Sequence, residues 1–129
     1  MILALHHAQI TIPKGTEDAA RKFYCGLLGL TELHKPEELA GRGGFWLLVG
    51  DRQVHVGTED TDKREGTKAH VAYLVVDIEK SRETLEGSGV KISDGIQIPG
   101  YQRFEFRDPF GNRIEFMQAI DQKVSGSAS

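Results

Sequence analysis

The fold can be read outward from a stretch near the end of the chain, Phe-Arg-Asp-Pro-Phe-Gly-Asn-Arg-Ile-Glu-Phe at residues 106–116. Asp-Pro and Gly-Asn are typical of turns, because proline fixes φ, glycine accepts positive φ, and Asp or Asn side chains bond nearby backbone. Apolar and charged residues alternate on both sides of the turn, with Phe104 and Phe106 before it and Ile114 after it. The stretch therefore predicts a β-hairpin whose apolar residues face a core and whose Glu115 lies on the opposite face.

Three other predicted strands carry a histidine on their polar face. The alternation of residues 5–12, 53–56 and 70–75 puts apolar side chains on one face of each strand and a histidine on the other. Four strands thus each offer one residue to a face that no apolar layer covers: His7, His55, His70 and Glu115. We interpret this set as the candidate site.

The composition is typical of one compact soluble domain, with 129 residues of which 39% are hydrophobic. The formal charge is −3, and the lysines and arginines are scattered, which argues against nucleic acid or an anionic membrane surface as a partner. The single cysteine, Cys25, cannot form an internal disulfide, and we find no secretion signal and no apolar run long enough for a membrane span. The sequence therefore predicts a cytoplasmic protein.

Turn and capping residues divide the chain into two halves with the same order of elements. The first half is expected to form a strand, a helix and three strands at residues 3–12, 16–28, 30–34, 45–49 and 53–56. The second half repeats this order at residues 70–76, 77–85, 90–93, 101–107 and 113–116. Thr16 and Asp77 are the expected helix caps, and the polar residues 58–68 are expected to connect the halves along the surface.

The candidate residues recur at matching positions of the two halves. His7 and His70 are 63 residues apart, and His55 and Glu115 are 60 apart. Two duplicated βαβββ modules would give this spacing. The sequence thus predicts an α+β fold built from a tandem repeat.

These boundaries define the expected domain organisation. Module one spans about residues 3–57 and module two about residues 69–118, within a single domain at residues 1–119. The polar, serine-rich and glycine-rich residues 120–129 are expected to form a disordered tail.

The arrangement resembles the vicinal oxygen chelate superfamily, which includes glyoxalase I, bleomycin resistance proteins and extradiol dioxygenases. Its motifs are Leu-His-His-Ala at residues 5–8, Ala-His-Val-Ala at 69–72 and Asp-Pro-Phe-Gly-Asn-Arg-Ile-Glu at 108–115, and the resemblance covers about residues 3–119. It implies the glyoxalase/bleomycin resistance/dioxygenase fold, in which two modules form a half-barrel sheet around a central cavity.

The resemblance also implies a divalent metal with His7, His70 and Glu115 as ligands. His55 stands where glyoxalase-like members place a fourth ligand, usually a glutamate. Imidazole and carboxylate independently suit Zn, Mn, Ni, Co or Fe(II), and this ligand set leaves open positions where a substrate can chelate. The identity of the metal stays open.

Further candidates share the polar face of the hairpin and the first strand. Arg103 has two readings that the sequence leaves open, because its guanidinium suits a substrate carboxylate or phosphate and equally suits Glu105. Gln9 and Tyr101 are weaker candidates for substrate binding. Glu115 and Arg103 are the expected catalytic residues.

The resemblance implies an enzyme that binds a small substrate through two neighbouring oxygens on the metal, as a lyase, an isomerase or a dioxygenase. The alternative is a non-catalytic protein that sequesters a small molecule, as bleomycin resistance proteins do. A homodimer is expected, because modules of two chains commonly pack together in this superfamily and residues 45–49 offer apolar surface.

Overall fold

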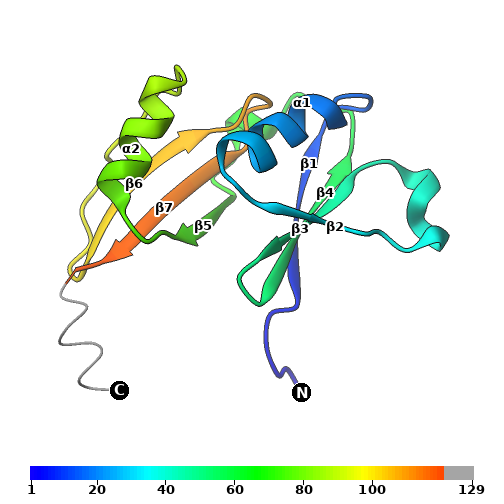
Figure 1. The fold of residues 1–129 in the computed structure, drawn as a ribbon, viewed down its shortest axis with the longest axis horizontal. Coiled ribbons are helices and arrows are strands. Elements are labelled where there is room, and N and C mark those ends of the chain that lie inside the picture. Colours follow the sequence, from blue (N-terminus) through cyan, green and yellow to red (C-terminus); the bar gives the residue numbers. More distant parts are fainter. Residues whose placement is uncertain (121–129) are drawn as a thin grey trace. The chain divides into compact units, whose positions relative to one another are not determined.

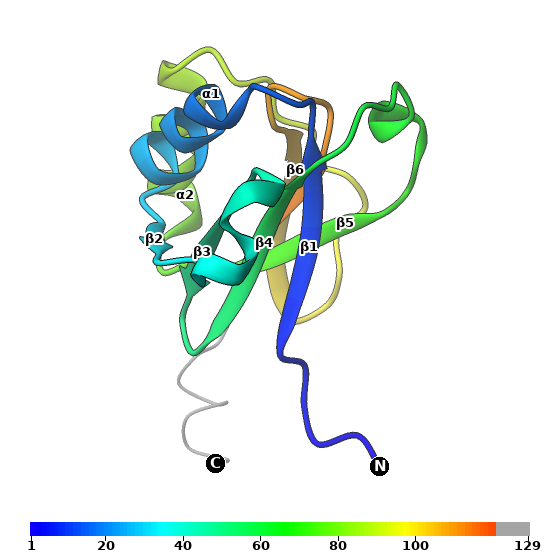
Figure 2. The same cartoon turned by 90° about the vertical axis from the view of Figure 1, so that its right-hand side faces the viewer.

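A computed structural model describes residues 1–120, which form two compact units (Figures 1 and 2). Unit 1 comprises Met1–Thr67 together with the turn Pro109–Asn112, and unit 2 comprises Lys68–Asp108 together with residues 113–120. The predicted tail lies, apart from Ile120, outside the described residues. No helix within residues 1–120 is long and apolar enough to cross a membrane.

Unit 1 contains one mixed sheet and the first helix. Its elements are β1 (His7–Ile12), α1 (Glu17–Arg21), the π-helical η1 (Lys22–Leu27), β2 (Thr31–Leu33), the 3-10 helix η2 (Glu37–Arg42), β3 (Phe45–Val49), β4 (Arg52–Thr58) and the 3-10 helix η3 (Arg64–Gly66). The strand order is β1-β4-β3-β2, with β1 parallel to β4 and the other pairs antiparallel. Figure 2 shows β1 beside β4, with residues 1–6 continuing beyond the start of β1.

Unit 2 contains the second sheet and the second helix. Its elements are β5 (His70–Leu74), α2 (Ile78–Gly87), β6 (Tyr101–Arg107) and β7 (Arg113–Ala119). The strand order is β5-β7-β6, with β5 parallel to β7 and β6 antiparallel to it. In Figure 1, α2 lies along β6 and β7. Two modules of βαβββ type in mixed sheets confirm the predicted α+β fold and the predicted hairpin.

Strand alternation places the core of each unit as the sequence predicts. In unit 1 the buried apolar residues are Ile12, Ala20, Phe23, Tyr24, Phe45, Leu47, Val54 and Val56. In unit 2 they are Tyr73, Ile78, Leu85, Phe104, Phe106, Ile114 and Phe116. The opposite face of each sheet carries the candidate site residues, because neighbouring side chains of a strand point to opposite faces.

The two helices begin at the predicted caps, but only one side chain serves as a cap. Asp77 accepts a hydrogen bond from the backbone N–H of Lys80 at 3.1 Å, as expected of an N-cap aspartate. Thr16 instead donates its hydroxyl to the carbonyl of Pro13 at 2.6 Å, so the prediction of a side-chain cap there is wrong. The hydroxyl thus bonds to the preceding turn and accepts no hydrogen bond from the first N–H groups of the helix.

Two other predicted segments differ from the structure. The expected strand at 90–93 is reduced to one bridge, in which Ser93 and Glu105 exchange backbone hydrogen bonds of 2.8 and 2.7 Å. The connection at 58–68 is not a plain surface loop, because Arg64 is 7% exposed and donates to the carbonyls of Thr11 at 2.7 Å and Thr61 at 2.9 Å. A charged residue thus anchors a segment that lacks apolar ones.

Gly44, just before β3, occupies a position that no other residue type fits. Its φ is +79°, and a Cβ there would lie 2.1 Å from the carbonyl oxygen of Val56 on β4. We expect Gly44→Ala to lower the free energy of unfolding by at least about 2 kcal/mol, because the backbone of two paired strands must move apart. Urea unfolding monitored by Trp46 fluorescence would measure this.

Gly41 in η2 provides the matched control, since a Cβ there would meet no atom within 4 Å. Gly41→Ala is expected to change the free energy of unfolding by less than about 0.5 kcal/mol. Equal stabilities for the two variants would contradict the described path of the chain into β3.

Candidate functional site

The structure brings the four predicted metal ligands together as two pairs, one inside each unit. In unit 1 the ring of His7 on β1 stacks on that of His55 on β4, two residues beyond its register partner Gln53. In unit 2 the side chain of His70 on β5 contacts that of Glu115 on β7, two residues beyond its register partner Arg113. Within residues 1–120 no group of three or more His, Cys, Asp or Glu side chains gathers closely enough to hold a metal ion.

The histidine pair of unit 1 forms an aromatic stack with Trp46. The ring centroids of His55 and His7 lie 3.9 Å apart, and the two ring planes make an angle of 14°. The ring centroids of His55 and Trp46 lie 4.1 Å apart, with an interplanar angle of 5°. The sequence analysis did not identify Trp46 as part of the site, although a signal exists. The turn at Gly50-Asp51 pairs Val49 with Arg52, and this register puts Trp46 opposite His55.

Burial keeps His55 uncharged at neutral pH. Desolvation, followed by the proximity of His7, His6 and Lys35, lowers the pKa of His55 to about 4. His55 Nε2 donates to Gln53 Oε1 at 2.8 Å, which leaves the lone pair on Nδ1. His55 therefore offers a neutral imidazole, the form that can bind a metal.

His6 lies beside the histidine pair, just before the first strand. The strand begins only at His7, and His6 Nδ1 lies 2.9 Å from His7 Nδ1. The remaining histidine, His34, is exposed and apart from these residues in sequence.

His70 is oriented by a backbone carbonyl. Its Nδ1 lies 2.9 Å from the carbonyl oxygen of Lys68, and its Nε2 lies 3.2 Å from Oε1 of Glu115. A carbonyl oxygen only accepts, so Nδ1 carries the proton and a neutral ring has its lone pair on Nε2. That lone pair then faces a carboxylate oxygen, and the contact is favourable only with a cation, either a second proton or a metal ion.

The geometry of this pair fits a divalent metal. Ligand atoms at about 2.0–2.2 Å from one metal, with bond angles between 90° and 110°, lie roughly 3.0–3.5 Å apart. The separation of 3.2 Å between His70 Nε2 and Glu115 Oε1 falls in this range. A carbonyl acceptor on the other ring nitrogen is also usual for a metal-bound histidine.

The other oxygen of Glu115 belongs to a row of alternating charges, which we call the charge ladder: Arg113, Glu105, Arg103 and Glu115. Arg103 Nε donates to Glu115 Oε2, Arg103 Nη2 donates to Glu105 Oε2 at 2.6 Å, and Arg113 Nη2 donates to the same oxygen of Glu105. Burial would raise the pKa of Glu105, but the hydrogen bonds from Arg113 and Arg103 outweigh it and lower that pKa. The ladder balances two cations against two anions.

The other predicted site residues occupy different settings. Arg103 donates with all three nitrogens, since its Nη1 also bonds the carbonyl of Ile96 at 2.6 Å, so the pairing alternative of the sequence analysis is formed. Tyr101 is 36% exposed, on the same face of β6 as Arg103. Gln9 lies against Gly57, where a Cβ would meet its amide nitrogen at 2.7 Å. The roles of these residues toward a substrate stay predictions.

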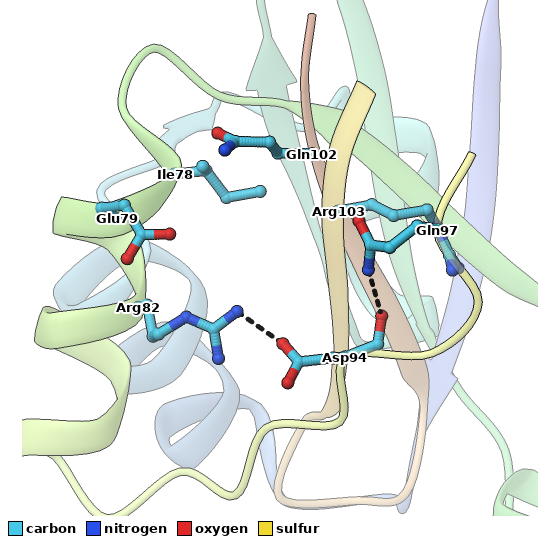
Figure 3. Close-up of a pocket in the computed structure, with 7 residues that line it drawn as sticks. All are labelled: Ile78, Glu79, Arg82, Asp94, Gln97, Gln102 and Arg103. Atoms are coloured by element: carbon cyan, nitrogen blue, oxygen red, sulfur yellow. Dashed lines mark hydrogen bonds and ion pairs between the residues drawn. The ribbon is translucent and has the colours of Figure 1, made fainter. Parts of the chain in front are cut away.

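A small pocket of about 110 Å³ lies between α2 and the segment before β6 (Figure 3). Figure 3 shows Arg82 directed at Asp94, with which it forms an ion pair of 2.6 Å, and Gln97 donating to the carbonyl of Asp94. Arg103 lines one side of the pocket, but Arg82, Asp94 and Gln97 bond mainly to one another. We therefore place the candidate site at the charge ladder and His70.

Comparisons with known proteins agree with this fold. The model of the Glyoxalase/Bleomycin resistance protein/Dioxygenase superfamily matches residues 4–116. A protein from Bacillus anthracis, provisionally assigned to the glyoxalase family, is 38% identical, with a TM-score of 0.86 over 93% of this chain and 98% of that one. A fosfomycin resistance protein, FosX, from Listeria monocytogenes is 14% identical, with a TM-score of 0.75 over 98% of this chain and 99% of that one.

The strength of these matches differs. None of the curated proteins matches the chain significantly. The likeness to FosX shows the fold alone, whereas the family model covers most of the chain and the Bacillus anthracis protein matches in sequence as well. The chain belongs to the glyoxalase/bleomycin resistance protein/dioxygenase superfamily.

Proposed function

We propose that this protein is a metal-dependent enzyme of lyase, isomerase or dioxygenase type that acts on a small molecule with two neighbouring oxygens. His70 and Glu115 would hold a divalent metal, and His7 and His55 would supply the further ligands that the sequence predicts, from the same chain or from a second copy. Such a metal supplies Lewis-acid stabilisation of negative charge that develops on substrate oxygen.

The contact between His70 and Glu115 carries this proposal. His70 Nε2 and Glu115 Oε1 lie 3.2 Å apart. Both are acceptors, because the carbonyl of Lys68 holds the proton of the neutral ring on Nδ1. A site that already directs a lone pair and a carboxylate at the same point requires a positive charge there. Zn, Mn, Ni, Co and Fe(II) meet the preference of imidazole and carboxylate.

The residues around the pairs would orient the substrate and exclude water. By strand register, Leu33, Trp46 and Leu48 share the face of His55 and form an apolar surface beside it. An apolar part of a substrate would lie there and displace water. His55 adds no positive charge at neutral pH, so the apolar surface stays uncharged.

The proposed activity can be tested by a screen of metal-loaded protein. We expect turnover of at least one compound from a panel of diols, ketoaldehydes and epoxides, and loss of that turnover after treatment with a chelator. Restoration by one of Zn, Mn, Ni, Co or Fe(II) would identify the metal. Metal binding without any turnover, together with tight binding of a panel compound, would instead support a sequestering protein.

We also propose the homodimer that the sequence predicts. Leu48 is 39% exposed and Leu74 78% exposed, so each sheet presents apolar side chains that a second copy can cover. Light scattering at micromolar concentration would contradict this if it gave the mass of a single chain.

A further inference from the structure

We propose that Arg103 is a positioning residue that binds one carboxylate oxygen of Glu115, turns the other oxygen toward His70, and lowers the affinity of this pair for a divalent cation. The inference rests on the proposed metal-binding function. It concerns a residue that would not itself touch the metal.

The two oxygens of Glu115 have different partners. Oε2 accepts from Arg103 Nε, and Oε1 lies 3.2 Å from His70 Nε2. The side chains of Arg103 and Glu115 are only 9% and 7% exposed, so water has little access to replace the contact between them. A cation between His70 and Glu115 would therefore meet Oε1 alone, and Glu115 would coordinate through one oxygen.

Arg103 is itself held in place. Its Nη1 donates to the carbonyl of Ile96 and its Nη2 to Glu105, both at 2.6 Å. A Cβ on Gly95 would lie 2.8 Å from Arg103 Nη1, so the glycine, at a φ of +63°, leaves room for the guanidinium. Because three nitrogens have fixed acceptors, the guanidinium cannot turn toward a substrate without breaking several contacts.

The charge of Arg103 opposes the binding of a cation. With Arg103 present, the charge of Glu115 is already balanced, and an incoming divalent ion is repelled by the nearby guanidinium. Without Arg103, Glu115 would be a buried carboxylate lacking a balancing charge, which a metal ion would neutralise. Removal of the arginine should thus tighten metal binding, whereas loss of a purely structural residue would weaken it.

Titration of the chelator-treated full chain with Co²⁺, followed by its d–d absorption, tests this inference. We expect Arg103→Met to lower the Kd for Co²⁺ by at least about tenfold. We also expect weaker d–d bands, because Glu115 can then coordinate through both oxygens and raise the coordination number. Arg103→Lys keeps the charge, but its compact ammonium lacks the planar fork that reaches Glu115, Glu105 and Ile96 from three separate nitrogens. Its Kd should therefore stay within about threefold of the wild type while its spectrum changes.

Arg82→Met is the matched control. Arg82 forms an ion pair with Asp94 rather than with Glu115, so its loss should leave both the Kd and the spectrum unchanged. If Arg103→Met fails to fold, the spectrum of Arg103→Lys decides.

Equal or weaker Co²⁺ binding by folded Arg103→Met, or a wild-type spectrum in Arg103→Lys, would overturn the inference while the proposed metal site stands. A wild-type protein that binds no Co²⁺ would overturn the proposed function and the inference with it.

Discussion

Glu115→Gln is expected to abolish the stabilisation that divalent metal gives to the wild type and also to destabilise the metal-free protein. A ligand that binds only the folded state, at a hundredfold excess over its Kd, adds about 2.7 kcal/mol, or roughly 10 °C in melting temperature for a chain of this size. The amide is a weak metal ligand, so this increment should vanish. Melting curves with chelator and with added Zn, Mn, Ni, Co or Fe(II) would measure both effects.

The loss of stability in the metal-free variant follows from the charge ladder. Glu115 is 5% exposed and accepts from Arg103, so neutralising it leaves a buried guanidinium with one carboxylate fewer, at a cost of about 2 kcal/mol. The sequence alone suggests no such cost, because it groups Glu115 only with histidines. Glu83→Gln, at an exposed position of α2, is the control and should leave both curves unchanged. An unchanged metal response in Glu115→Gln would remove Glu115 from the site.

The second large effect concerns pH. His55 has a pKa of about 4 in the folded protein, below its unfolded value of about 6.5. Above pH 6.5 the ring is neutral in both states, whereas between pH 6.5 and 4 only the unfolded chain takes up the proton, so stability falls as the pH falls. The shift corresponds to about 3 kcal/mol, lost across this window.

His55→Phe would remove this contribution while retaining a ring between His7 and Trp46. In the presence of chelator, urea unfolding at pH 7.5 and at pH 4.5 should show a smaller loss of stability on acidification for His55→Phe than for the wild type. His34→Phe, at an exposed position, should behave as the wild type does. The same acid sensitivity in His55→Phe and the wild type would mean that His55 is not a buried neutral histidine.

Much of the fold could be predicted because its signals are local. Alternation along each strand identifies the faces, so the hairpin around Asp108-Pro109 and its buried phenylalanines follow from the sequence. The same alternation put His55 and Glu115 on the polar faces. The predicted strand at 90–93 is longer than the structure shows, where only Ser93 forms a bridge. A short alternation of apolar residues is compatible both with a paired strand and with a single bridge.

The partners of the site residues could not be predicted, because they depend on pairing between strands far apart in sequence. His70 pairs in register with Arg113 and Arg103 with Met117, so each is a diagonal neighbour of Glu115 and contacts it across the strands. The sequence around Arg103 does not indicate whether its guanidinium binds a substrate or pairs with a carboxylate of the protein. The carbonyl of Lys68, which fixes the proton of His70, carries no side-chain signal at all.

Calorimetric titration of chelator-treated protein with Zn²⁺ tests the central claim, that His70 and Glu115 hold a divalent metal, most directly. We expect saturable binding in the wild type and in His34→Ala, and a Kd raised at least about tenfold in His70→Ala. Imidazole binds a metal only in its neutral form, so protons compete with Zn²⁺ and wild-type binding should weaken on acidification. Wild-type affinity in His70→Ala would contradict the account.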